Sequence, residues 1–254
     1  MPFAPYIFST ALFSLLRVNV LIIIFCLVSA TSFDQPLSSD SLNQTGAINN
    51  YKQYTSQVRG SLLLYNGAEY AFAYPGMQGF PFFNTAYFEE GTVCFDHIVY
   101  YQVPLQLDLL NSILITKSAK GLSLMLDAKM VDSFLISNHL FIYLSADSIS
   151  GLNTSSGYYE RLYNGKTKVF IKRRKQQERS FRAEDPYIFK EYDDYFILNG
   201  NRYYKIEKKK DINRAFKNHY KETSSYLKSL RINFKKNKDR YLTEAATYYD
   251  HFGN

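Results

Sequence analysis

The amino-acid sequence predicts a mainly β protein with a C-terminal α-helical segment, the β part being an antiparallel sandwich or a rolled, barrel-like sheet built from hairpins. Strand-like apolar runs recur roughly every 8–12 residues from residue 58 onward. Asn-Gly pairs separate several of these runs, and a helical spacing of apolar residues begins only after residue 210. Short strands at this spacing are typical of both sheet architectures, so the sequence leaves that choice open.

Residues 1–30 have the features of a signal peptide. Arg17 supplies the positive charge, residues 20–28 supply the apolar run, and Val28-Ser29-Ala30 supply the positions before a cleavage point. An uncleaved membrane anchor is the alternative, because residues 11–30 match the roughly 20 apolar residues that span a bilayer. We therefore expect an exported protein, either in the periplasm or at the outer membrane, or anchored in the inner membrane if the segment is retained.

Residues 31–57 are predicted to be a polar tether, because they are rich in Ser, Asn, Gln and Thr and show no apolar period. Beyond residue 30 only Cys94 remains of the chain's two cysteines, which excludes an internal disulfide. The 23 Tyr and 20 Phe residues supply the apolar area of a packed core. Stability is expected to come from that core.

Residues 58–207 are expected to form the antiparallel β domain. Asn-Gly is the strongest short hairpin signal, because a type I′ turn needs a positive φ at both central residues. It predicts turns at Asn66-Gly67 between the runs 61–65 and 69–73, at Asn164-Gly165 and at Asn199-Gly200. Further hairpins are expected around Asp96-His97, across residues 117–121 and around residues 137–139.

Residues 208–254 are predicted to be a basic helical segment with three short helices. The first helix places on one face Ile212, Ala215, Phe216 and Tyr220. The second is marked by Leu227 and Leu230, with Thr223 or Ser224 as its cap. The third follows Asn237 and carries a stripe of Leu242, Ala245, Tyr249 and Phe252. Short helices are stable only when an apolar face is packed, so the segment is expected to be docked.

Charge is divided unevenly along the chain. Residues 31–158 carry five Lys or Arg against ten Asp or Glu, a net charge of −5, whereas residues 159–254 carry 24 against 13, a net charge of +11. A cationic surface with interleaved tyrosines attracts anions and can stack on sugars or bases. The candidate anion-binding or partner-binding residues are Lys172, Arg173, Arg174, Lys175, Arg202, Lys205, Lys208, Lys209, Lys210, Lys235 and Lys236. The alternative is a solvated cationic face whose lysines only keep strand edges from pairing.

Residues 74–88, YPGMQGFPFFNTAYF, are predicted to form a loop rich in Pro, Gly and Phe. The candidate ligand-binding residues of this loop are Tyr74, Phe80, Phe82 and Phe83, and Glu89, Glu90 or Asp96 would lie near its rim. The simpler interpretation is that the aromatic rings cover one end of the core.

No catalytic, metal-binding or cofactor-binding residue is predicted. The four histidines lack the i, i+4 spacing of a helical zinc site, and the sequence contains no phosphate-binding glycine loop or nucleophile elbow. Cys94 lies three residues from His97, but the predicted turn at Asp96-His97 explains these residues without chemistry.

A resemblance extends over most of residues 58–254. It is carried by YYQVPL at 100–105, YERLYNGKTKV at 159–169, NRYYKI at 201–206 and AATYYD at 245–250. These segments are similar to uncharacterised, signal-peptide-bearing envelope proteins of Bacteroidota, in which a β-rich region precedes a basic helical end. The resemblance implies a cell-envelope setting and assigns no activity.

The function expected from the sequence is that of an exported, non-enzymatic binding or structural module. Its cationic C-terminal half would contact an envelope protein or an anionic envelope surface, and export would keep it away from nucleic acid. Membrane association is also expected if the N-terminal segment stays uncleaved. The alternative function is an enzyme or small-ligand binder that uses loop 74–88 and nearby acidic residues.

Overall fold

The protein's structure, a computed structural model, describes residues 63–71, 73–149, 154–181, 187–216 and 219–252. By its contacts the chain divides into Met1–Gln53 and Tyr54–Asn254, and all described residues belong to the second unit. The signal peptide or anchor predicted at residues 1–30 and the tether predicted at 31–57 lie outside the described residues. Within the described part, no helix is both long enough and apolar enough to cross a membrane.

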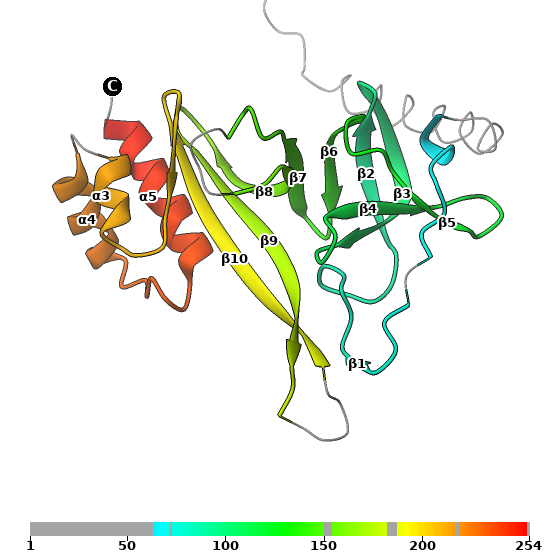
Figure 1. Ribbon diagram of the computed structural model, residues 1–254. Helices are drawn as coiled ribbons and strands as arrows, with labels where there is room; N and C mark the ends of the chain where they lie inside the picture. Colours follow the sequence, from blue (N-terminus) through cyan, green and yellow to red (C-terminus); the bar gives the residue numbers. More distant parts are fainter. Residues whose placement is uncertain (1–62, 72, 150–153, 182–186, 217–218, 253–254) are drawn as a thin grey trace, which may run out of the picture. The chain divides into compact units, whose positions relative to one another are not determined.

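One sheet of 11 strands is the largest element of the described chain (Figure 1). Its strands are β1 (Met77–Gln78), β2 (Glu89–Phe95), β3 (Ile98–Asp108), β4 (Ile113–Lys117), β5 (Ser123–Met125), β6 (Val131–Ile136), β7 (His139–Leu144), β8 (Gly157–Asn164), β9 (Lys168–Arg179), β10 (Tyr187–Asn199) and β11 (Arg202–Lys205). Their order is β1-β10-β9-β8-β7-β6-β2-β3-β4-β5, and β11 pairs with β10 outside this path. The mainly β fold class is confirmed.

The strand order results from two meanders that share one sheet. Strands β2 to β5 follow one another toward one edge, and β6 then returns to pair with the free side of β2. Strands β6 to β10 follow one another in the opposite direction, and all these pairs are antiparallel. Only the two-residue strand β1 pairs in parallel, on the outer side of β10.

The hairpin positions after residue 90 agree with the sequence prediction, but the Asn-Gly turns differ in type. The turns with a positive φ at both central residues are Asp96-His97, at 51° and 62°, and Ser137-Asn138, at 49° and 64°. Asn199 instead ends β10, and Gly200 alone has a positive φ, 59°, in the two-residue loop before β11. Three residues, 165–167, separate β8 from β9. Asn164-Gly165 and Asn199-Gly200 therefore mark hairpins correctly without forming the expected type I′ geometry.

The hairpin predicted at Asn66-Gly67 is wrong. The run before it ends in a short 3₁₀ helix, η1 (Leu63–Tyr65), and the run after it lies along β5. The Tyr70 N–H donates to the Ser123 carbonyl at 2.9 Å, and the Met125 N–H donates to the Ala68 carbonyl at 2.8 Å. The backbone groups that a hairpin would pair with each other are thus bonded to β5.

The single sheet rolls upon itself, which favours the rolled architecture over a sandwich. The N–H of Lys175 on β9 donates to the carbonyl of Leu109, just after β3, at 3.1 Å. The loop that precedes β2 closes the remaining gap, because the Phe83 N–H donates to the Leu107 carbonyl at 2.8 Å. Inside the roll Phe134 stacks on Phe141 at 4.9 Å between ring centroids, and Phe83 meets Phe141 edge-on at 5.2 Å.

Three helices form the C-terminal segment, as predicted: α3 (Asp211–Ala215), α4 (Tyr220–Ser229) and α5 (Lys238–Phe252). Their boundaries differ from the prediction in one place. Tyr220 begins α4 instead of extending α3, and the residue at the N-cap of α4 is His219, not Thr223 or Ser224. Thr223 lies inside the helix, where its hydroxyl donates to the His219 carbonyl at 2.7 Å. Phe252, expected on the docked stripe, is exposed.

Helices α3 and α5 pack against the part of the sheet formed by β8 to β11, and α4 packs against α5 (Figure 1). Their apolar faces bury Phe216, Leu242 and Ala245 against Val169 and Ile197. The helices are also hydrogen-bonded to the sheet. The Asp250 carboxylate, near the end of α5, accepts the backbone N–H of Thr167 at 3.0 and 3.1 Å. The predicted docking of the basic segment is confirmed.

Truncation of Leu242 to Ala should lower the free energy of unfolding by about 2–5 kcal/mol, because Leu242 is fully buried between α5 and the sheet. The matched control is Leu122→Ala, since Leu122 is 46% exposed and its truncation should cost far less. Urea denaturation measures both. Equal losses would contradict the docking of α5.

Candidate functional site

The predicted cationic run 172–175 lies on β9, an interior strand between β8 and β10. The run therefore protects no sheet edge. The alternative interpretation, in which its lysines only keep strand edges from pairing, is wrong for these residues. The four side chains do not form one open surface either, because Lys172 is only 7% exposed and the Arg173 side chain only 11%. Each of the four interacts with groups of the protein itself.

Arg173 is the centre of a buried ion network. Its Nε lies 2.5 Å from Glu160 Oε2, its Nη1 3.0 Å from Asp193 Oδ2, and its Nη2 2.9 Å from Asp239 Oδ2. The three carboxylates come from β8, β10 and the first turn of α5. One guanidinium thereby joins two strands and a helix, which its planar five-donor fork allows and a lysine would not.

Two further groups extend the Arg173 network. His139 Nδ1 lies 2.5 Å from Glu160 Oε1, and the Tyr195 hydroxyl donates to Asp239 Oδ1 at 2.6 Å. Burial, followed by the hydrogen bond and the charge of Asp239, raises the pKa of Tyr195. Burial acts to lower the pKa of Arg173, but the hydrogen bond and charge of Glu160 outweigh it, so the pKa of the guanidinium is raised. Arg173 therefore stays charged and Tyr195 stays protonated.

Lys172 and Lys175 are held by neutral oxygens. Lys172 Nζ donates to the Ser155 carbonyl and hydroxyl, both at 2.6 Å, and to the Ser156 carbonyl at 3.3 Å. Lys175 Nζ donates to the carbonyls of Phe80 and Phe82, at 3.2 and 2.7 Å. Burial lowers the pKa of both ammonium groups. Arg174 differs, because its Nε is paired with Asp194 Oδ2 at 3.0 Å.

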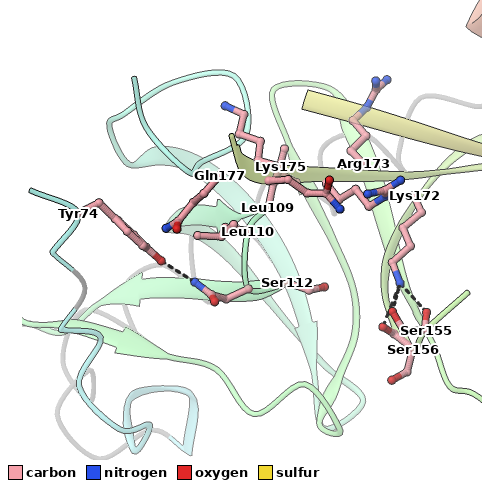
Figure 2. A pocket seen from close by; sticks show the side chains of 13 residues that line it. Tyr74, Leu109, Leu110, Ser112, Ser155, Ser156, Lys172, Arg173, Lys175 and Gln177 are labelled. Carbon is pink, nitrogen blue, oxygen red and sulfur yellow. Dashed lines mark hydrogen bonds between the residues drawn. The ribbon is translucent and has the colours of Figure 1, made fainter. Parts of the chain in front are cut away.

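A cleft of about 780 Å³ lies beside this run and is called here the β9 cleft. It is lined by Tyr74, Leu109, Leu110, Asn111, Ser112, Ser155, Ser156, Lys172, Arg173, Arg174, Lys175, Gln176 and Gln177. Figure 2 shows two sets of hydrogen bonds at opposite ends of the cleft. Asn111 Nδ2 donates to the Tyr74 hydroxyl at 2.8 Å at one end, and Lys172 meets Ser155 and Ser156 at the other.

The aromatic loop contributes only one of its four candidate residues, Tyr74, to this cleft. Phe83 is buried against Phe141 and meets His139 edge-on at 5.1 Å. Phe80 lies under Lys175, and Phe82 bridges to Asp108 at the end of β3. Phe80, Phe82 and Phe83 thus help to close the roll, as in the simpler interpretation. The rim carboxylates expected at residues 89, 90 and 96 are not among the residues that line the cleft.

A second hollow, of about 510 Å³, gathers part of the predicted cationic set in the helical segment. We call it the lysine hollow; it is lined by Glu207, Lys208, Lys209, Ile232, Asn233, Phe234 and Lys235. Its two walls are the connections from β11 to α3 and from α4 to α5. In the described chain, none of the exposed residues Lys208, Lys209 and Lys235 forms an ion pair.

Two side chains shape the walls of the lysine hollow. Asp211 Oδ2 accepts the backbone N–H groups of Glu207 and Lys208, at 3.0 and 2.8 Å. Asn233 Oδ1 accepts those of Lys235 and Lys236, at 2.9 and 3.1 Å. Short polar side chains that bond backbone groups two to four residues away fix such turns. The lysines are therefore presented by ordered turns.

The other predicted cations lie around these two sites. Lys205 pairs with Asp194 and with Glu207, both at 3.2 Å, so the one carboxylate of the lysine hollow is already neutralised. Lys210 and Lys236 are exposed next to the hollow on the same connections. Arg202 is exposed on β11, with its guanidinium 5.4 Å from the Tyr204 ring centroid.

The neighbouring Cys94 and His97 share a partner, Asp132. Cys94 Sγ lies 3.4 Å and His97 Nδ1 3.1 Å from Asp132 Oδ2. Burial, together with the hydrogen bond and charge of Asp132, raises the pKa of the Cys94 thiol. This environment disfavours the thiolate, which is the opposite of what activates a nucleophilic cysteine.

Several residues of these sites were not predicted from the sequence. Glu160, Asp193 and Asp239 neutralise Arg173, and only the pairing of β9 with β10 places Asp193 directly opposite it. The sequence could have indicated two of these partners, because the β9–β10 hairpin pairs residues of opposite charge. Asp193 lies opposite Arg173, and Asp194 lies opposite Lys172. Nothing in the sequence indicates that residues 112, 155 and 156 would meet β9, because the meeting depends on how far the sheet rolls.

No group of three or more His, Cys, Asp or Glu side chains within the described ranges is arranged to hold a metal ion. No protein-family model matches this chain, and no curated protein or solved structure matches it significantly. Function must therefore be inferred from the geometry of the β9 cleft and the lysine hollow.

Replacement of Arg173 by Met should lower the free energy of unfolding by about 3–5 kcal/mol, because it leaves the buried Glu160 carboxylate without its arginine counter-ion. Chemical denaturation at neutral pH measures this loss. The control is Arg174→Met, whose carboxylate partner Asp194 keeps Lys205 and whose loss should be about 1 kcal/mol. Similar losses for the two variants would contradict the central role of Arg173.

Proposed function

We propose that this protein is a non-enzymatic binding module of the cell envelope whose lysine hollow engages the phosphate groups of an anionic membrane surface. The observation that carries the proposal is the lysine hollow itself, which Lys208, Lys209 and Lys235 line from two ordered turns without a carboxylate partner. Export by the N-terminal segment is part of the proposal, because it brings the hollow to an envelope surface. The envelope setting implied by the resemblance to Bacteroidota proteins agrees with it.

The distribution of paired and unpaired cations supports the helical segment as the contact surface. The β9 run is neutralised or enclosed inside the protein, so it contributes little to an outer surface. The lysines of the hollow, with Lys210 and Lys236 beside them, remain exposed. A lysine near an anionic membrane contributes about 1 kcal/mol, so three lysines give about 3 kcal/mol of reversible attraction.

A second candidate function, the binding of a small ligand, is favoured by the β9 cleft. The sequence hypothesis expects a pocket where loop 74–88 meets the sheet, and Tyr74 of that loop lines the cleft.

The variant Lys208→Gln/Lys209→Gln/Lys235→Gln should bind protein-free vesicles with phosphatidylglycerol about 100-fold more weakly than the unaltered protein at low salt. The matched control changes three exposed lysines elsewhere, Lys117→Gln/Lys120→Gln/Lys129→Gln, and should bind nearly as the unaltered protein does. Vesicle flotation between about 50 and about 500 mM salt measures the binding, which should weaken as screening increases.

Comparison of the two triple variants removes any contribution of an uncleaved N-terminal segment, because both retain it. If the two variants bound the vesicles equally well, the lysine hollow would not be the contact surface. If the protein were retained on native envelopes but did not bind protein-free vesicles, its partner would be an acidic envelope protein and not the lipid surface.

A further inference from the structure

The β9 cleft has an unusual set of lining residues. Of the 13 residues that line it, four are basic, none is acidic, and only Leu109 and Leu110 are apolar. Its volume of about 780 Å³ lies within the range of small-molecule sites, which is about 300–1,000 Å³. Most such sites are lined mainly by apolar side chains, so a lining this rich in cations, hydroxyls and amides selects a polar ligand.

Two of the cations carry charge that no carboxylate neutralises by direct contact. Lys172 is buried and Lys175 half-buried, and all the hydrogen-bond acceptors that hold their ammonium groups are carbonyl or hydroxyl oxygens. Among the described residues, no carboxylate oxygen lies within 4.0 Å of either Nζ. Asp194 opposite Lys172 is already shared by Arg174 and Lys205. A buried charge without a counter-ion is costly, so a negative group in the cleft would be stabilised.

Arg174 supplies the group that can contact the anion directly. It is half-buried, with its guanidinium 5.1 Å from the Tyr192 ring centroid, and Nε is the only side-chain nitrogen that is hydrogen-bonded within the described chain. The remaining N–H groups of the guanidinium are free to bind an oxyanion, and the fork geometry matches a carboxylate or a phosphate. The negative end of a ligand is therefore expected at the Lys172 and Arg174 end of the cleft.

The backbone around the cleft brings a hydroxyl close to this end. Ser112 has a φ of 57°, which is uncommon for a residue with a side chain, and its Oγ accepts the Tyr158 N–H at 3.4 Å. Residue 157 is a glycine with φ of 144°, and a Cβ there would lie 2.7 Å from Ser112 Oγ and 3.8 Å from Lys172 Nζ. The glycine thus leaves room for Ser112 and Lys172 to approach each other across the cleft.

The rest of the lining can bind hydroxyl groups. Ser156, Asn111, Gln176 and Gln177 offer both donors and acceptors along the cleft. A ligand with one negative group and several hydroxyls would satisfy both the cationic end and this polar wall. We propose that the β9 cleft binds a small hydroxylated anion, namely a sugar that carries a carboxylate or a phosphate group. The proposal uses none of the residues of the lysine hollow and does not depend on membrane binding.

The test is calorimetric titration of the full chain with four probes: glucuronate, glucose 6-phosphate, glucose and inorganic phosphate. At least one of the two anionic sugars should bind at least about tenfold more tightly than glucose and than inorganic phosphate. The tighter of the two anionic sugars identifies the negative group as a carboxylate or a phosphate. No saturable binding of either anionic sugar up to about 10 mM would overturn the proposal. If glucose bound as tightly as the anionic sugars, the cleft would not require a negative group. If inorganic phosphate bound as tightly as they do, the cleft would not require a sugar.

Two variants locate the site in the cleft. Arg174→Gln should weaken the binding of the preferred sugar at least about tenfold, whereas Arg202→Gln, with the same loss of charge on exposed β11, should leave it unchanged. Gln176→Glu adds a negative charge at an exposed lining position and should also weaken binding, so the test survives if the Arg174 variant does not fold. An affinity that is unaltered by Gln176→Glu, or lowered equally by Arg202→Gln, would place the sugar outside the β9 cleft.

Discussion

Arg173 lies where the rolled part of the sheet meets the part covered by helices, and its guanidinium bonds to Glu160 on β8, Asp193 on β10 and Asp239 on α5. Phe83 and His139 of the roll lie on one side of it, and Tyr195 bonds Asp239 on the other. Three carboxylates brought this close would repel one another without a cation between them. The position of α5 on the sheet thus depends on a single buried side chain as well as on the apolar face of the helix.

The cations of the C-terminal half differ in how available they are to partners. The C-terminal half has a large excess of positive charge, but Arg173 and Arg174 on β9 are paired with Asp193 and Asp194 on β10. Lys172 and Lys175 are enclosed by carbonyl oxygens, and the lysines of the α3 and α5 connections have no such partners. A uniform cationic run in the sequence therefore becomes two different environments, an enclosed polar cleft and an exposed basic hollow.

Local sequence signals predicted the hairpins and helices, because these depend on residues close to one another in the chain. Ser137-Asn138 and Asp96-His97 turn where expected, and the stripe containing Leu242 and Ala245 packs as expected. Asn66-Gly67 carries the same signal and forms no hairpin, because β5 competes for the backbone groups beside it. The β9 cleft could not be predicted, since it forms only where the roll brings residues 109–112 against a strand 60 or so positions later.

In the described chain the β9 lysines are enclosed by carbonyl and hydroxyl oxygens, whereas Lys208, Lys209 and Lys235 of the helical connections are exposed and form no ion pair. Timed acetylation of the native protein, read out for each lysine by mass spectrometry, measures this directly. Lys208, Lys209 and Lys235 should be modified at least about tenfold faster than Lys172 and Lys175, because the latter must await local opening of the structure even though burial lowers their pKa. Equal rates for Lys172 and Lys208 would contradict the account.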